Sequence, residues 1–125
     1  MKLSVIVPVY NMEEGGKLEF CMDSLLKQTL QDMEIIAVND ASTDRSLDIL
    51  RIYERNHPGK VRVISYTKNK RQGGAKNEGL KAATGEWVGF IDSDDWIAPT
   101  YYEKLLKRAE ETGADLVGCD YSLVD

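Results

Sequence analysis

Apolar and polar positions along this chain alternate in short blocks. Several apolar runs are rich in β-branched residues, and most of them end in polar or acidic residues. The runs at 3–7 and 34–38 have no polar face, which is typical of central strands in a parallel sheet. The run at 61–66 alternates between apolar and polar residues, which predicts a strand nearer the sheet edge. Further strands are expected at 86–91 and 115–119.

Between these runs, apolar residues recur at helical spacing. They repeat at intervals of three and four over residues 16–28, which predicts a helix there. A second helix is expected to follow a capping residue at Ser42 or Thr43. A helix of small residues is expected over 73–83, and a fourth helix is expected to hold Pro99 in its first turn.

Repeated β-α units predict the fold class. They favour an α/β fold with a doubly wound, mostly parallel sheet, helices on both faces and right-handed crossovers. The chain of 125 residues is long enough for one domain with a core, so residues 1–125 are taken as a single unit. Ligands of such sheets bind beyond the carboxyl ends of the strands.

Composition excludes several function classes. A net charge of -5 argues against a nucleic-acid partner, which would require a basic face. The single histidine, His57, lies in a turn, which removes Ser-His-Asp and Cys-His chemistry. Cys21 and Cys119 fall in core patterns without metal-ligand spacing, which predicts reduced thiols in a cytoplasmic protein. The first apolar run is broken by Pro8 and is too short for a signal peptide or a membrane span.

The clearest chemical signal is Asp92-Ser93-Asp94-Asp95, called here the acidic segment, which ends an apolar run. Three neighbouring carboxylates repel one another unless a cation lies among them. Hard carboxylate oxygens suit Mg²⁺ or Mn²⁺, and these metals commonly bind together with phosphates. The acidic segment therefore predicts a site for a metal and a diphosphate.

Two other strand ends, at residues 8–11 and 39–44, are also polar. Taken singly, the first is equally explained as loop punctuation and the second as helix capping, and the acidic segment could likewise begin a helix. Together they would lie on one edge of a parallel sheet, which favours a shared binding site. Neither a P-loop nor a dinucleotide-binding glycine motif is found, so metal and basic side chains are expected to hold the phosphates.

Four segments resemble, in order, the motifs of family 2 glycosyltransferases with the GT-A fold. They are residues 5–11, 38–44, 69–87 and 90–95, the last being similar to the D-x-D segment of that family. The resemblance extends over about residues 3–100 and implies a nucleotide-sugar site.

The resemblance implies roles for the residues that line the nucleotide. Pro8 and Tyr10 would border the base, with the ring of Tyr10 packed against it. Asp40 would accept a hydrogen bond from the uracil edge or contact the ribose. Asn69 and Lys76 would line the base and phosphate side.

The resemblance also implies the metal ligands. Asp92 would face the ribose, Asp94 would bind Mn²⁺ or Mg²⁺, and Asp95 would be a neighbour of the metal or the sugar. Two departures bear on the phosphate contacts: residues 70–71 are basic where relatives commonly have glycines, and Lys76 stands where they commonly have arginine. Lysine provides a point charge without the bidentate fork of arginine.

The implied activity is metal-dependent, inverting transfer of a sugar from a nucleotide diphosphate, with UDP expected, to a hydroxyl of a saccharide or lipid-linked acceptor. Synthesis of cell-surface polysaccharide or glycolipid would be the context. The general base would lie in an acceptor-binding half beyond residue 125, so residues 1–125 are expected to be the donor-binding part of a longer enzyme. Asp120 is a candidate contact to a sugar hydroxyl.

Other interpretations remain open from the sequence. The chain could be a nucleotide-sugar-binding module without turnover, which donor binding without transfer would reveal. A metal-dependent phosphotransfer receiver fits poorly, because its acidic residues would follow the first and third strands. A cytoplasmic location is expected, with association at the inner membrane face through other parts of the protein as an alternative.

Overall fold

The computed structural model describes residues 2–68 and 71–112. Within these ranges, four parallel strands form one sheet in the order β3-β2-β1-β4. The strands are β1 (Leu3–Val9), β2 (Met33–Asp40), β3 (Val61–Tyr66) and β4 (Trp87–Phe90). The helices are α1 (Lys17–Leu26), α2 (Ser46–Asn56), α3 (Arg71–Ala82) and α4 (Tyr101–Thr112), and a 3-10 turn, η1 (Glu14–Gly16), precedes α1.

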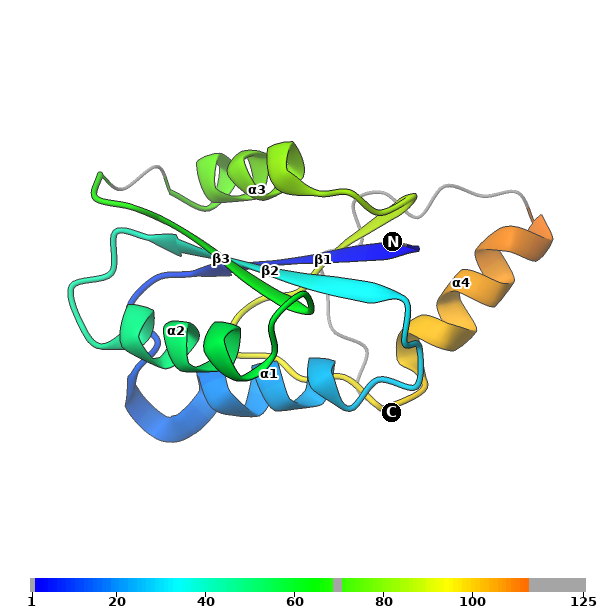
Figure 1. Ribbon diagram of the computed structural model, residues 1–125, viewed down its shortest axis with the longest axis horizontal. Coiled ribbons are helices and arrows are strands. Elements are labelled where there is room, and N and C mark those ends of the chain that lie inside the picture. The colour runs from blue at the N-terminus through cyan, green and yellow to red at the C-terminus, as the bar shows by residue number, and fades with distance from the viewer. Residues whose placement is uncertain (1, 69–70, 113–125) are drawn as a thin grey trace.

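Helices cover both faces of this sheet, as the sequence predicts. Figure 1 shows α3 on one side of the strands and α1 and α2 on the other. In β1, Val5 and Val7 belong to the apolar cluster that includes α1, α2 and α4, whereas Ile6 belongs to the cluster against α3. Because both faces are covered, β1 and β2 carry apolar side chains in both directions. The predicted edge position of β3 is confirmed by the strand order.

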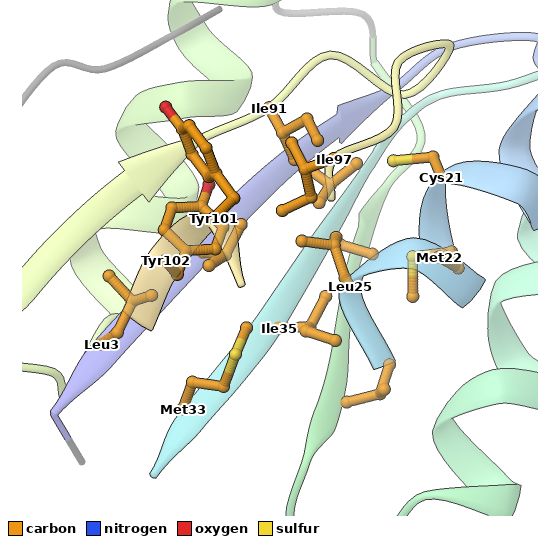
Figure 2. Close-up of a cluster of buried hydrophobic side chains, with 14 of the residues drawn as sticks. Leu3, Cys21, Met22, Leu25, Met33, Ile35, Ile91, Ile97, Tyr101 and Tyr102 are labelled. Carbon is orange, nitrogen blue, oxygen red and sulfur yellow. The ribbon is translucent and has the colours of Figure 1, made fainter. Parts of the chain in front are cut away.

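The apolar cluster that includes α1, α2 and α4 holds the segment after β4 in place. Figure 2 shows Cys21 and Leu25 of α1 in one cluster with Ile91 and Ile97. Ile91 and Ile97 are both buried, and they stand immediately before the acidic segment and shortly after it. Tyr102 of α4 lies in the same cluster. Apolar anchors on both sides therefore hold the acidic segment against the domain.

Two predicted helix starts were wrong. α2 begins at Ser46 rather than directly after Ser42 or Thr43, because those two residues bind the loop after β1 instead. The N-cap position is Arg45, which makes no side-chain cap bond, and Asp44 Oδ1 accepts a hydrogen bond from the first helical N–H, that of Ser46, at 2.9 Å. α4 begins at Tyr101, after Pro99.

Pro99 lies outside that helix because its carbonyl oxygen accepts a hydrogen bond from the Thr29 N–H at 2.8 Å. The fifth strand predicted at 115–119, with Cys119 and Asp120, falls outside the described residues. Among residues 2–68 and 71–112, no helix combines the length and the apolarity needed to cross a bilayer.

A buried carboxylate joins the strands at the amino edge of the sheet. Glu34 Oε2 accepts hydrogen bonds from the Ser4 hydroxyl at 2.5 Å and from the Thr84 N–H at 2.9 Å. Arg62 forms an ion pair with Glu34 Oε1 at 3.2 Å. At Gly85, a Cβ would lie 2.6 Å from the Ser4 backbone nitrogen, so only glycine fits. Thr84 and Gly85 are therefore packing residues at the edge opposite the predicted site.

Candidate functional site

The loops after β1 and β2 are joined by reciprocal hydrogen bonds. Asn11, at a left-handed φ of 50°, accepts through Oδ1 from the Thr43 N–H at 2.8 Å and donates its own N–H to Ser42 Oγ at 3.0 Å. Further bonds run from the Met12 N–H to Ser46 Oγ and from the Glu13 N–H to Asp44 Oδ2. Much of the polar 39–44 motif thus holds the neighbouring loop in place.

Tyr10 and Asp40 lie where the first two strands meet these loops. Val9 is paired with Asn39, so Tyr10 and Asp40 follow as the next residues at the carboxyl edge of adjacent strands. Tyr10 is 49% exposed, and its ring is available to a ligand. Pro8 lies one step inside β1, half-buried and paired with Val38.

Asp40 is more enclosed than its predicted role suggests. It is only 3% exposed and is paired in register with Tyr66 of β3. Burial and the negative charge of Asp40 raise the pKa of Tyr66 well above its ordinary value. Ala41, directly after Asp40, has a left-handed φ of 58°, so the chain turns sharply at this point.

The acidic segment gathers three carboxylates at the end of β4. Asp92, Asp94 and Asp95 each offer a carboxylate oxygen, and these oxygens lie within 4.8 Å of one another. Asp94 is exposed, whereas Asp92 and Asp95 are half-buried. Two oxygens bound to one Mg²⁺ at about 2.1 Å stand at most about 4.2 Å apart, so small side-chain rotations would complete such a site. The residues present therefore fit a hard divalent cation.

α1 lies beside the acidic segment. The Cys21 thiol donates to the Asp92 carbonyl oxygen at 3.6 Å. Burial, followed by the charges of Asp95, Asp94 and Asp92, raises the pKa of Cys21 to about 12, so this side chain stays a thiol at neutral pH. The prediction of a buried, reduced Cys21 is confirmed.

Lys76 lies on α3, on the opposite face of the sheet from α1. Its Nζ stands 5.3 Å from the centroid of the Phe90 ring, in cation–π geometry. Because Phe90 is the last residue of β4, this charge lies near the strand end that carries the acidic segment. Asn69 falls outside the described residues.

Sequence reasoning missed an aromatic pair at this end of the sheet. The rings of Phe20 on α1 and Trp96, which follows the acidic segment, have centroids 5.8 Å apart. Phe20 is 58% exposed. The signal was present in the sequence, because Phe20 departs from the apolar stripe of the predicted 16–28 helix.

The chain and its fold match a known family. The family model for glycosyl transferase family 2 matches residues 4–123. The chain belongs to glycosyltransferase family 2. The predicted resemblance is therefore confirmed, and with it the α/β GT-A fold class.

Among similar members of this family is the uncharacterized glycosyltransferase EpsJ of Bacillus subtilis, which is 43% identical over 119 residues, 95% of this chain and 33% of EpsJ. A solved structure of S. aureus TarS in complex with UDP-GlcNAc has a TM-score of 0.80 and 35% identity, over 89% of this chain and 32% of the other.

A third relative carries a metal. The mannosyltransferase PcManGT of Pyrobaculum calidifontis, in complex with GDP-Man and Mn²⁺, has a TM-score of 0.68 and 30% identity over 76% of this chain and 28% of its own. The chain thus spans about a third of the length of each of these three relatives.

Proposed function

We propose that this chain is the donor-binding part of a metal-dependent, inverting glycosyltransferase that uses a nucleotide diphosphate sugar, with UDP as the expected nucleotide. The observation that carries the proposal is the cluster of three carboxylates at the end of β4, on the same sheet edge as Tyr10 and Asp40. Family membership supports it, as do the nucleotide-sugar complexes of similar proteins.

Each residue has a role in this proposal. Asp94, with Asp95 beside it, would hold Mn²⁺ or Mg²⁺, and a bound ion would supply charge neutralisation on the departing diphosphate. Asp92 would orient the ribose. Tyr10, whose ring is exposed, would pack against the base, and Asp40 would accept a hydrogen bond from the uracil edge or contact the ribose.

The remaining contacts complete the donor site. Pro8 would border the base beside Tyr10. Lys76 would add positive charge on the phosphate side, and its place over the end of β4 supports this role. Asn69 would line the same side.

The acceptor is proposed to be a saccharide or a lipid-linked sugar, in the synthesis of cell-surface polysaccharide or glycolipid. Because the chain matches about a third of the length of EpsJ and of TarS, we assign the general base and the acceptor-binding half to the rest of a longer enzyme. The proposed location is the cytoplasm, at the inner face of the membrane.

Calorimetry with UDP, with and without Mn²⁺, tests the donor site. We expect Mn²⁺ to strengthen UDP binding, and Asp94→Ala to weaken the Mn²⁺-dependent binding at least about 10-fold. Asp48→Ala, which removes an exposed carboxylate from α2, is the matched control and should bind like the unaltered protein. A parallel titration with GDP tests the choice of base.

Equal UDP affinity with and without Mn²⁺, or in Asp94→Ala, would overturn the metal role of the acidic segment. Tighter binding of GDP than of UDP would overturn the choice of uracil while leaving the diphosphate site in place. UDP binding without release of sugar from any nucleotide-sugar donor, in a longer protein that includes the acceptor-binding half, would favour a binding module instead.

A further inference from the structure

The exposed aromatic pair Phe20–Trp96 has no role in the donor site. Phe20 is the most exposed large apolar side chain in the described ranges, at 58%, and Trp96 is half-buried. Their ring centroids are 5.8 Å apart and their planes are tilted by 38°. Aromatic rings offer a large apolar contact area, and the exposed face of this pair lies next to the candidate site, where a ligand could cover it.

The pair is continuous with the acidic segment. Trp96 follows Asp95 directly, and Cys21, the neighbour of Phe20, donates its thiol hydrogen to the Asp92 carbonyl. Ile97, immediately after Trp96, is buried in the core and its N–H donates to Ser24 Oγ of α1 at 3.3 Å. The two rings are therefore held by anchored backbone at the side of the carboxylates that α1 covers.

We propose that Phe20 and Trp96 are the part of the acceptor site that this chain contributes, a platform for a pyranose ring next to the donor sugar. The inference rests on the proposed donor site, since it places the acceptor beside the metal-bound diphosphate. An aromatic face carries partial negative charge and attracts the polarised C–H groups on the apolar face of a pyranose. Asp95, directly before Trp96, would accept a hydrogen bond from a hydroxyl at the edge of the same ring through a carboxylate oxygen that does not bind the metal.

The negative charge beside Phe20 and Trp96 restricts which sugars could bind to the two rings. The three carboxylates and a bound diphosphate together outweigh the charge of one divalent cation, so the surroundings of the rings stay negative and disfavour an anionic group on the bound sugar unit. A neutral pyranose, with an apolar face and hydroxyl donors around its edge, is complementary to both parts of the surface. The platform would thus bind an uncharged sugar unit at the acceptor end.

Saturation-transfer NMR with methyl β-D-glucopyranoside, methyl β-D-galactopyranoside and methyl N-acetyl-β-D-glucosaminide tests the platform, with UDP and Mn²⁺ present. We expect saturation of the ring C–H protons of at least one pyranoside. Phe20→Ala and Trp96→Ala should each weaken that binding at least about fivefold, while Trp96→Phe should retain most of it. The affinity for UDP, measured separately by calorimetry, should be unchanged in all three variants.

Ile52→Ala and Leu80→Ala are the controls, since both remove exposed apolar side chains elsewhere, on α2 and α3. They should leave pyranoside binding unchanged. No saturation of any of the three pyranosides, or equal saturation in Phe20→Ala and Trp96→Ala, would overturn the platform whether or not UDP binds. Displacement of the pyranoside by millimolar tetramethylammonium would assign the rings to a cationic ligand and would also overturn it. Failure of UDP to bind would overturn the donor site alone.

Discussion

Glu34 shows how a single buried charge can be structural in a protein whose other notable acids lie at a candidate site. It is enclosed at the amino edge of the sheet and is bound by Ser4, Thr84 and Arg62. Burial by itself would raise the pKa of Glu34, but the hydrogen bonds from Ser4 and Thr84, with the charge of Arg62, outweigh it and lower the pKa. The carboxylate therefore stabilises the fold in its ionised form.

The lowered pKa of Glu34 determines how its contribution to the free energy of unfolding depends on pH. A glutamate whose pKa is lowered in the folded state contributes its full stability above the ordinary value of about 4.3, and loses it as the pH falls through the folded-state pKa. We expect Glu34→Gln to lower the free energy of unfolding at pH 7 by about 1–3 kcal/mol. Urea unfolding at several pH values should show this difference shrinking below about pH 4.

Glu103→Gln, on the exposed side of α4, is the control and should leave the free energy of unfolding nearly unchanged. A difference between Glu34→Gln and the unaltered protein that stays constant down to pH 3 would contradict the role of the charge.

At the scale of an element, two glycines of α3 have different roles because their surroundings differ. Gly79 is buried against β1, and a Cβ there would lie 2.5 Å from Cγ2 of Ile6, which is itself fully buried. Gly73, in the same helix, has nothing within 4 Å of its Cβ position. One glycine allows close packing of helix on strand, and the other only weakens the helix.

This contrast predicts opposite effects from the same substitution. Gly79→Ala should lower the free energy of unfolding by about 1–3 kcal/mol, because Ile6 has no space into which to move. Gly73→Ala should raise it by about 0.5–1 kcal/mol through helix propensity. Chemical denaturation of the two variants measures both effects, and effects of equal sign would refute the packing argument.

At the scale of the whole molecule, Gln28 connects the end of α1 to the start of α4. It is buried after α1, and its Nε2 donates to the Ala98 carbonyl at 2.7 Å while its Oε1 accepts from the Tyr102 N–H at 3.1 Å. One amide side chain thus satisfies polar backbone groups before and within α4. Since the acidic segment lies between β4 and these contacts, Gln28 also fixes one end of the loop that carries the carboxylates.

Gln28→Ala should therefore affect both stability and binding. Loss of the bond from the Tyr102 N–H, and of one of the two bonds to the Ala98 carbonyl, should lower the free energy of unfolding by about 1–3 kcal/mol. A looser acidic segment should also weaken Mn²⁺-dependent UDP binding. Gln31→Ala, at an exposed position nearby, is the control for thermal unfolding and calorimetry. Wild-type stability in Gln28→Ala would show that these bonds do not hold the loop.

The local pattern of apolar and polar residues predicted most of the helices and strands, but not the role of every residue at their ends. The strands and helices within the described ranges lie close to their predicted positions, because buried strands and amphipathic helices have distinct periodicities. The capping residue of α2 was wrong, since Ser42 and Thr43 form hydrogen bonds with a loop about 30 residues away. Such long-range competition for a hydroxyl leaves no local signal.

The sequence by itself determined the fold class, the parallel direction of the strands that brings three polar strand ends to one edge, and the grouping of carboxylates after one strand, since these follow from periodicity and residue type. Only the tertiary structure decided which polar residues hold the fold together and which stay accessible at the candidate site. It placed Thr84 and Gly85 at the opposite edge, enclosed Asp40, and set Phe20 beside Trp96. The physical reason is that burial and contact depend on what the rest of the chain brings to each residue, and no window of neighbouring positions contains that information.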